Sequence, residues 1–125
     1  HNRIEILEDL IIHGNFEFDS GYKAIDILLE KEKDVTAIFA HNDMMAIGAM
    51  KALTEKGLRI PEDIAIIGFD NIPLSLYVTP VLSTVTVPVY EMGRTSMKIL
   101  ADLLANVEVP RITTLPTKLT LRQSC

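Results

Sequence analysis

Polar and aromatic side chains follow three apolar segments of the sequence, and their types suit the binding of a small polar molecule. Phe16 follows the first segment, His41 and Asn42 follow the second, and Asp70 follows the third. A carboxylate and an amide can hydrogen-bond hydroxyl groups or ring nitrogens, and an aromatic ring can stack on a flat ligand. We therefore take Phe16, His41, Asn42 and Asp70 as candidate ligand-binding residues.

Each of these residues also has a purely structural explanation. Asn42 or Asp43 is of the type that caps the start of a helix, and Asp70 can simply begin a turn. An acid that ends a core strand is nevertheless costly to leave unpaired, which favours a ligand-facing role for Asp70. Phe16 can pack in the core or in a loop, and His41 can be a satisfied histidine at the edge of a sheet. Both kinds of role stay open for these residues.

Motifs of catalysis and of phosphate or metal binding are missing from the sequence. It holds no GxGxxG, no glycine-rich phosphate loop and no GxSxG. The three histidines show no metal-ligand spacing, and Cys125 is the single cysteine. Two pairs, His41 with Asp43 and Asp43 with Asp70, could exchange protons, but no nucleophile accompanies them. We expect a protein that is not an enzyme and that needs no metal and no cofactor.

Length and charge narrow the function further. A chain of 125 residues suits one domain, and 48% hydrophobic residues suit a globular one. The formal charge of -5 opposes phosphate binding, so the chain is not expected to bind nucleic acid by itself. No apolar run approaches the roughly 20 residues of a membrane span, and no signal peptide is evident. One cysteine excludes an internal disulfide, so we expect a cytoplasmic protein.

Alternating strands and helices must position the candidate residues. The patterns predict the following elements: strands at Leu10–His13, Thr36–Ala40, Ile64–Phe69, Leu82–Val87 and Lys118–Arg122, and helices from Asp19 or Ser20 to about Glu30, from Asn42 or Asp43 to about Lys56, and at Tyr90–Asn106. This order predicts an α/β fold with a doubly wound, mainly parallel sheet and helices on both faces. Right-handed crossovers bring successive strand ends to one edge, so the candidates should meet in one crevice.

The helix that begins near Asn42 is apolar almost all round in its first three turns. Such a helix is covered on more than one side, so one side should pack on the sheet and the other needs a second layer. We expect that layer to be a partner subunit, with Met44, Met45, Ile47 and Met50 at a homodimer interface. The alternative is that the chain's own loops bury the helix.

Six segments carry a resemblance to a known family. They are Thr36–Met50, Gly57–Asp63, Ile67–Asn71, Thr79–Thr84, Glu91–Arg94 and Leu115–Arg122. Each segment alone is a weak indication of a family, but the order and spacing of the six segments together are highly specific. Together they resemble the C-terminal half of the effector-binding region of bacterial LacI/GalR regulators, and the resemblance runs from about Leu10 to Cys125.

The resemblance implies a fold similar to periplasmic sugar-binding proteins, with two α/β lobes around a ligand cleft, in a homodimer. It implies that Phe16 stacks on the ligand and that Asn42 and Asp70 hydrogen-bond it. Residues 1–125 would be the C-terminal part of the effector-binding and dimerisation domain, without most of the N-terminal lobe. A helix-turn-helix head, also absent, would bind DNA. The helix at 90–106 would pack on the other lobe, so here it must fold back or dock on another copy.

The expected function is that of a ligand-sensing module of a transcriptional repressor that responds to a sugar, a sugar derivative or a purine. The first alternative is a transport protein that captures sugar for uptake, since the two classes share a fold. A small enzyme that uses Asp43 or Asp70 is a second alternative. Control by a phosphorylated carrier protein, known among some relatives, is a third.

Overall fold

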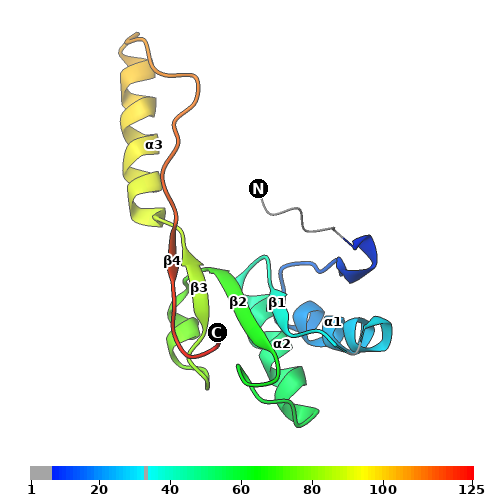
Figure 1. Ribbon diagram of the computed structural model, residues 1–125. Coiled ribbons are helices and arrows are strands. Elements are labelled where there is room, and N and C mark those ends of the chain that lie inside the picture. Colours follow the sequence, from blue (N-terminus) through cyan, green and yellow to red (C-terminus); the bar gives the residue numbers. More distant parts are fainter. Residues whose placement is uncertain (1–6, 33) are drawn as a thin grey trace.

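The computed structural model describes residues 7–32 and 34–125. Figure 1 shows a sheet with two helices packed beside it and a third helix that stands away. The elements in chain order are η1 (Glu8–Leu10), α1 (Phe18–Lys31), β1 (Ala37–Phe39), α2 (Asp43–Glu55), β2 (Ala65–Asp70), η2 (Pro73–Leu76), β3 (Ser83–Thr86), α3 (Val89–Leu104) and β4 (Lys118–Thr120). Across the described residues, no helix combines the length and the hydrophobicity of a membrane span.

The sheet has the order β1-β2-β3-β4, and three of its strands are parallel. Only β4 runs antiparallel, next to β3. Since β1, β2 and β3 point the same way, their carboxyl ends lie at one edge, as the alternation of strands and helices predicted. The mainly parallel α/β fold is therefore confirmed.

Helix α2 packs on the sheet and forms the centre of the core. Its residues Ala46 and Leu53 are fully buried, as is Ile66 of β2. The side chains of Ile67 and Phe69 alternate to the other face, where they are half-buried. Helical cover was expected on both faces, and α2 supplies it for the face of Ile66.

Two glycines let α1 approach α2 closely. A Cβ on Gly21 would lie 2.1 Å from the carbonyl oxygen of Met45, and a Cβ on Gly48 would lie 2.1 Å from the carbonyl oxygen of Phe18. Both distances are far inside van der Waals contact with rigid backbone. Residues 21 and 48 therefore have no room for any side chain.

Replacing Gly48 with alanine should destabilise the protein by about 1–3 kcal/mol, because the methyl group forces the two helices apart. The free energy of unfolding from urea titration measures this loss. Gly93 is the matched control, since nothing lies within 4 Å of a Cβ built there. Gly93→Ala should instead stabilise α3 by up to about 1 kcal/mol. Equal effects of the two substitutions would contradict the close helix contact.

Two expectations for the N-terminal region were wrong. Leu10–His13 is not a strand: Leu10 ends η1, and the following residues are irregular backbone. This segment and β1 line the same apolar hollow of about 580 Å³, but Leu10 and Ile11 remain 36% and 52% exposed, so the run is neither paired as a strand nor buried in the core. Helix α1 begins at Phe18, not after Ser20. The Ser20 hydroxyl donates to the Glu17 carbonyl at 2.8 Å and accepts from the Asn15 amide at 3.1 Å.

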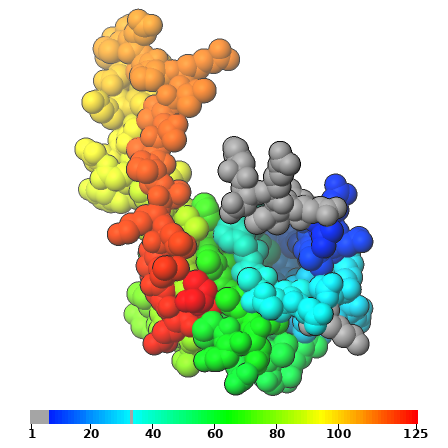
Figure 2. All heavy atoms as spheres, viewed as in Figure 1, coloured from blue at the N-terminus to red at the C-terminus, as the bar shows by residue number. Residues whose placement is uncertain are grey.

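Helix α3 forms an arm that projects from the body of the molecule. Figure 2 shows this arm and the returning segment beside it, clear of the rest of the chain. None of the residues of α3 is buried. The stripe of Met92, Ile99, Leu100, Leu103 and Leu104, read from its spacing as a buried face, is thus not buried: Ile99 is half-buried, and the other four are 46–79% exposed. Helix α3 does not fold back onto the sheet (Figure 1). The segment that returns to β4 runs beside it (Figure 2).

Candidate functional site

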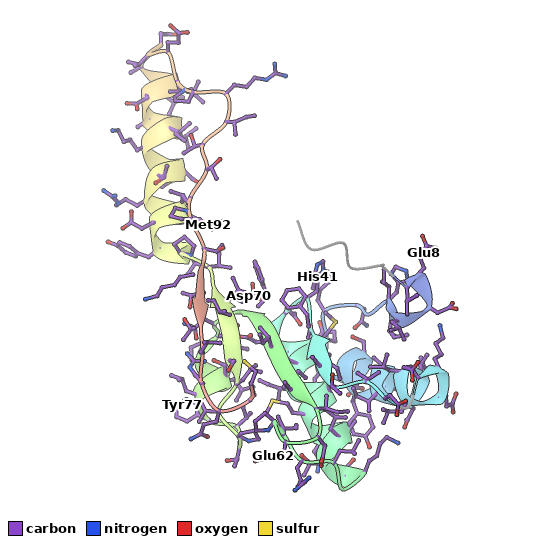
Figure 3. All side chains as sticks on the ribbon, in the orientation of Figure 1. Glu8, His41, Glu62, Asp70, Tyr77 and Met92 are labelled. Atoms are coloured by element: carbon purple, nitrogen blue, oxygen red, sulfur yellow. The ribbon has the colours of Figure 1, made fainter. Side chains whose placement is uncertain are left out.

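A pocket of about 620 Å³ lies at the carboxyl edge of the sheet. Its lining consists of the following residues: Phe16, Phe39, His41, Asn42, Phe69 and Asp70. All four candidate residues from the sequence are among them. Figure 3 shows His41 and Asp70 at the same end of the sheet, on the side toward the α3 arm. The convergence expected from the parallel topology is therefore present.

Asn42 has a structural role as well as a place in the pocket. Its Oδ1 accepts a hydrogen bond from the Met45 amide at 2.9 Å, which makes Asn42 the N-cap of α2. Its Nδ2 donates to the carbonyl oxygen of Phe16 at 2.8 Å. The capping interpretation is correct, and the same side chain also fixes the main chain of the aromatic residue. One N–H of the amide and one lone pair of Oδ1 remain for a ligand.

Aromatic rings form the apolar wall of the pocket. Phe16 and Phe39 are each 59% exposed, so their faces are open to a ligand. The His41 ring stacks toward Phe16 with a centroid distance of 6.4 Å and meets Phe39 edge-on at 6.2 Å. Phe16 has a φ of 68°, a left-handed conformation that the Asn42 bond helps to hold. The exposed rings and the imidazole suit a flat or ring-shaped ligand.

Asp70 provides the negative charge of the pocket. It is partly buried, and this desolvation raises the pKa of its carboxyl above the ordinary value of 3.8, with a smaller contribution from the negative charge of Asp43. A carboxylate in this setting gains from a ligand that donates hydrogen bonds, because the ligand replaces lost hydration.

This raised pKa predicts a pH-dependent effect of Asp70→Asn. The folded protein binds the Asp70 proton more tightly than the unfolded chain, so ionised Asp70 disfavours folding above its raised pKa. Asparagine carries no charge and also tolerates positive φ. The variant should therefore melt at a higher temperature than the wild type at neutral pH. The difference should vanish below pH 3.8, where both states are protonated; a difference constant with pH would contradict this assignment.

Beneath the pocket lies a fully buried carboxylate, that of Asp43. Its oxygens accept hydrogen bonds from the Thr84 hydroxyl at 2.5 Å and from the Ile72 amide at 2.8 Å. Asp43 also stands in the first turn of α2, where the helix dipole favours a negative charge. Gly68 leaves the space for it, since a Cβ there would lie 2.3 Å from Asp43 Oδ1. Asp43 thus ties α2 to the segment that follows β2.

The structure does not require a partner subunit to cover α2. Ile47 and Met50 are only 8% and 4% exposed within the single chain. Helix α1 supplies the second layer that was expected from a partner, because Gly21 and Gly48 allow close contact. Met44 and Met45 are half-buried and keep some free surface. The single chain does not test dimerisation, and the interface stays a prediction.

Two pocket residues were not among the sequence candidates. Phe39 ends β1, and Phe69 is the penultimate residue of β2. Their place at strand ends was a usable signal, but each was taken as part of an apolar core run. Among the described residues, no group of three or more histidine, cysteine or acidic side chains has the arrangement of a metal site.

Comparison with known proteins identifies the class. The family model described as periplasmic binding protein-like domain matches residues 5–125. The HTH-type transcriptional regulator MalR of Clostridium butyricum is 41% identical over 124 residues, which are 99% of this chain and 37% of that protein. The HTH-type transcriptional repressor PurR of Vibrio atlanticus is 48% identical over 95 residues, which are 76% of this chain and 28% of that protein.

Solved structures agree with these relatives. The Escherichia coli transcriptional repressor ascG superposes with a TM-score of 0.88 at 39% identity, over 98% of this chain and 45% of that chain. The transcriptional regulator CelR, solved as a cellobiose complex, gives a TM-score of 0.92 at 34% identity, over 98% of this chain and 38% of that chain.

The chain belongs to the periplasmic binding protein-like domain family, and within it to the LacI-type regulators, where it corresponds to part of the effector-binding region. It spans about a third of the length of the curated relatives named above. These relatives are transcriptional regulators rather than enzymes, in agreement with the expectation from the sequence.

Proposed function

We propose that the chain is the ligand-sensing and dimerisation module of a bacterial transcriptional repressor. The observation that carries the proposal is the single pocket that joins Phe16, His41, Asn42 and Asp70. Its aromatic wall and its carboxylate suit a sugar, a sugar derivative or a purine. In support, the similar transcriptional regulator CelR was solved as a cellobiose complex, and a LacI family transcriptional regulator from Arthrobacter was solved as a complex with lactose.

The pocket forms one wall of an effector site, and a second lobe closes over it. An effector that contacts both lobes favours the closed arrangement by the difference between its affinities for the closed and open forms. This difference in binding free energy also changes the affinity of the protein for DNA. A helix-turn-helix head outside these 125 residues binds the DNA. DNA binding in turn places the protein in the cytoplasm.

The exposed stripe of α3 is the surface on which the second lobe packs. Burying one leucine contributes about 1.5–3 kcal/mol, so several leucines left in water are costly. We expect these 125 residues, purified alone, to associate through α3, and the complete gene product to be a homodimer. Size-exclusion chromatography with light scattering measures both. A non-associating monomer of the isolated chain would contradict the role of α3.

The effector is identified by a thermal-shift screen of the complete gene product. The panel contains cellobiose, lactose, other sugars and their phosphates, and purines. An effector present at 100 times its dissociation constant stabilises the folded protein by about 2.7 kcal/mol. If a folded, DNA-binding preparation shows no stabilisation by any of these compounds, effector sensing of this kind is ruled out, and control by a carrier protein becomes the better explanation.

A further inference from the structure

The corner that carries the Asp70 carboxylate has an unfavourable backbone conformation. Asp70 has a φ of 109° and Asn71 a φ of 59°. Positive φ is uncommon outside glycine, although Asn and Asp adopt it more readily than other residues. Two successive residues of this kind at the end of β2 need specific contacts to hold them.

A guanidinium group from the far end of the chain provides one set of contacts. Arg122 follows β4, and its Nη2 donates to Asn71 Oδ1 at 2.5 Å. Its Nη1 donates to Ser75 Oγ at 3.0 Å and to the Leu82 carbonyl at 2.7 Å. The planar, forked shape of guanidinium lets one side chain join three segments at once.

A buried carboxylate provides the opposite set of contacts. Thr84 Oγ1 accepts a hydrogen bond from the Asn71 amide at 3.3 Å and donates to Asp43. Asp43 also accepts from the Ile72 amide. Asn71 is therefore held through its side chain by a cation and through its main chain by a network that ends on an anion. Arg122 and Asp43 do not themselves line the pocket.

We propose that Arg122 is a positioning residue that fixes the orientation of Asp70 for the effector, through Asn71. The proposal rests on the proposed function of the pocket, but its structural part does not depend on any ligand. Arg122 also bonds to Ser75 of η2, so it connects the pocket to the exposed turn that ends beside Tyr77 (Figure 3).

The test is a pH titration of the Asp70 carboxyl in the complete gene product. Carbon-13 NMR with labelled aspartate monitors the titration. In Arg122→Met the corner loses its anchor and becomes more solvated, so the pKa of Asp70 should fall toward 3.8. Removal of a positive charge without any movement would raise that pKa. A lower pKa of Asp70 in Arg122→Met therefore supports a positioning role for Arg122. An unchanged or higher pKa overturns the proposal.

Three further variants complete the experiment. Arg94→Met is the matched control, because Arg94 is exposed and its partner among the described residues is Glu91 on α3; the substitution should leave the titration of Asp70 unchanged. Asn71→Gly removes the acceptor of Arg122 while keeping a residue that tolerates positive φ, so it should act like Arg122→Met. If Arg122→Met does not fold, the pKa of Asp70 in Asn71→Gly decides whether the positioning role holds. Asn71→Asp keeps the acceptor and should retain wild-type amide exchange at residues 71–77.

Binding separates this proposal from the proposed function. With cellobiose, lactose and hypoxanthine as probes, a compound that stabilises the wild type should bind Arg122→Met at least 10-fold more weakly. If no compound of the full thermal-shift panel stabilises even the wild type while Arg122→Met still lowers the pKa of Asp70, the proposed effector function fails and the positioning role stands. Full-strength binding by Arg122→Met overturns the positioning role.

Discussion

Replacing Asp70 with alanine is expected to remove about half to nine-tenths of the thermal stabilisation that an effector gives to the protein. A hydrogen bond to a charged group contributes about 1.5–3 kcal/mol, which corresponds to a loss of roughly 10- to 150-fold in affinity. An effector at 100 times its wild-type dissociation constant stabilises by about 2.7 kcal/mol. In Asp70→Ala, a loss of that size leaves a stabilisation of roughly 0.3–1.4 kcal/mol. Thermal shift and calorimetric titration of the complete gene product measure the change.

The comparison needs a control for the loss of an acid. Asp34 is exposed and lies outside the pocket, so Asp34→Ala should keep the full stabilisation. Alanine at a φ of 109° also strains the folded protein. Each variant is therefore compared with its own ligand-free melting temperature. An undiminished shift in Asp70→Ala removes Asp70 from the binding site.

Replacing Asp43 with alanine is expected to cause the largest loss of folding stability. The substitution leaves the Ile72 amide and the Thr84 hydroxyl without an acceptor in a fully buried site. An unsatisfied buried polar group costs about 1–3 kcal/mol, so the loss should reach roughly 2–5 kcal/mol. Urea unfolding measures it as a lower midpoint at an unchanged m-value.

Asp63 is the control for this prediction. It pairs with Arg59 at the surface, and that interaction lowers the pKa of the Asp63 carboxyl to about 2. Surface ion pairs contribute little to stability, so Asp63→Ala should destabilise far less than Asp43→Ala. Asp43→Asn keeps one acceptor oxygen, so its loss of folding stability should lie between those of Asp43→Ala and Asp63→Ala. Similar losses for Asp43→Ala and Asp63→Ala would show that the buried network has no special role.

The position of the pocket could be predicted from the sequence because it depends on few rules. Continuous apolar strands that alternate with helices indicate a parallel sheet, and the carboxyl ends of its strands share an edge. Asn42 and Asp70 follow strands that the structure contains, so the convergence of these two residues followed from topology. The strand predicted at Leu10–His13 was wrong, yet Phe16 still reaches the pocket, because Asn42 holds its carbonyl oxygen.

Other features could not be predicted because they depend on contacts between distant residues. The apolar character of α2 indicated that a second layer covers the helix. It did not indicate whether that layer comes from the same chain or from a partner subunit. Gly21 and Gly48 allow α1 of the same chain to be that layer, because each glycine lies against the backbone of the other helix. This role is visible only when the two helices are placed side by side. The same holds for Arg122, whose partners Asn71 and Ser75 lie 51 and 47 residues away in the chain. No local pattern predicts a contact of that kind.

The attachment of α3 limits how it can turn. The chain leaves the sheet through β3 and returns through β4, and these two strands pair with each other. The hydroxyl oxygens of Thr86 and Thr120 lie 2.7 Å apart, and Thr86 is the sheet partner of Asp70. Because both ends of the arm are attached through this one strand pair, the base of the arm lies next to Asp70. Under the proposed function, an effector held by that carboxylate is bound at the base of the arm, beside the strand pair from which α3 projects.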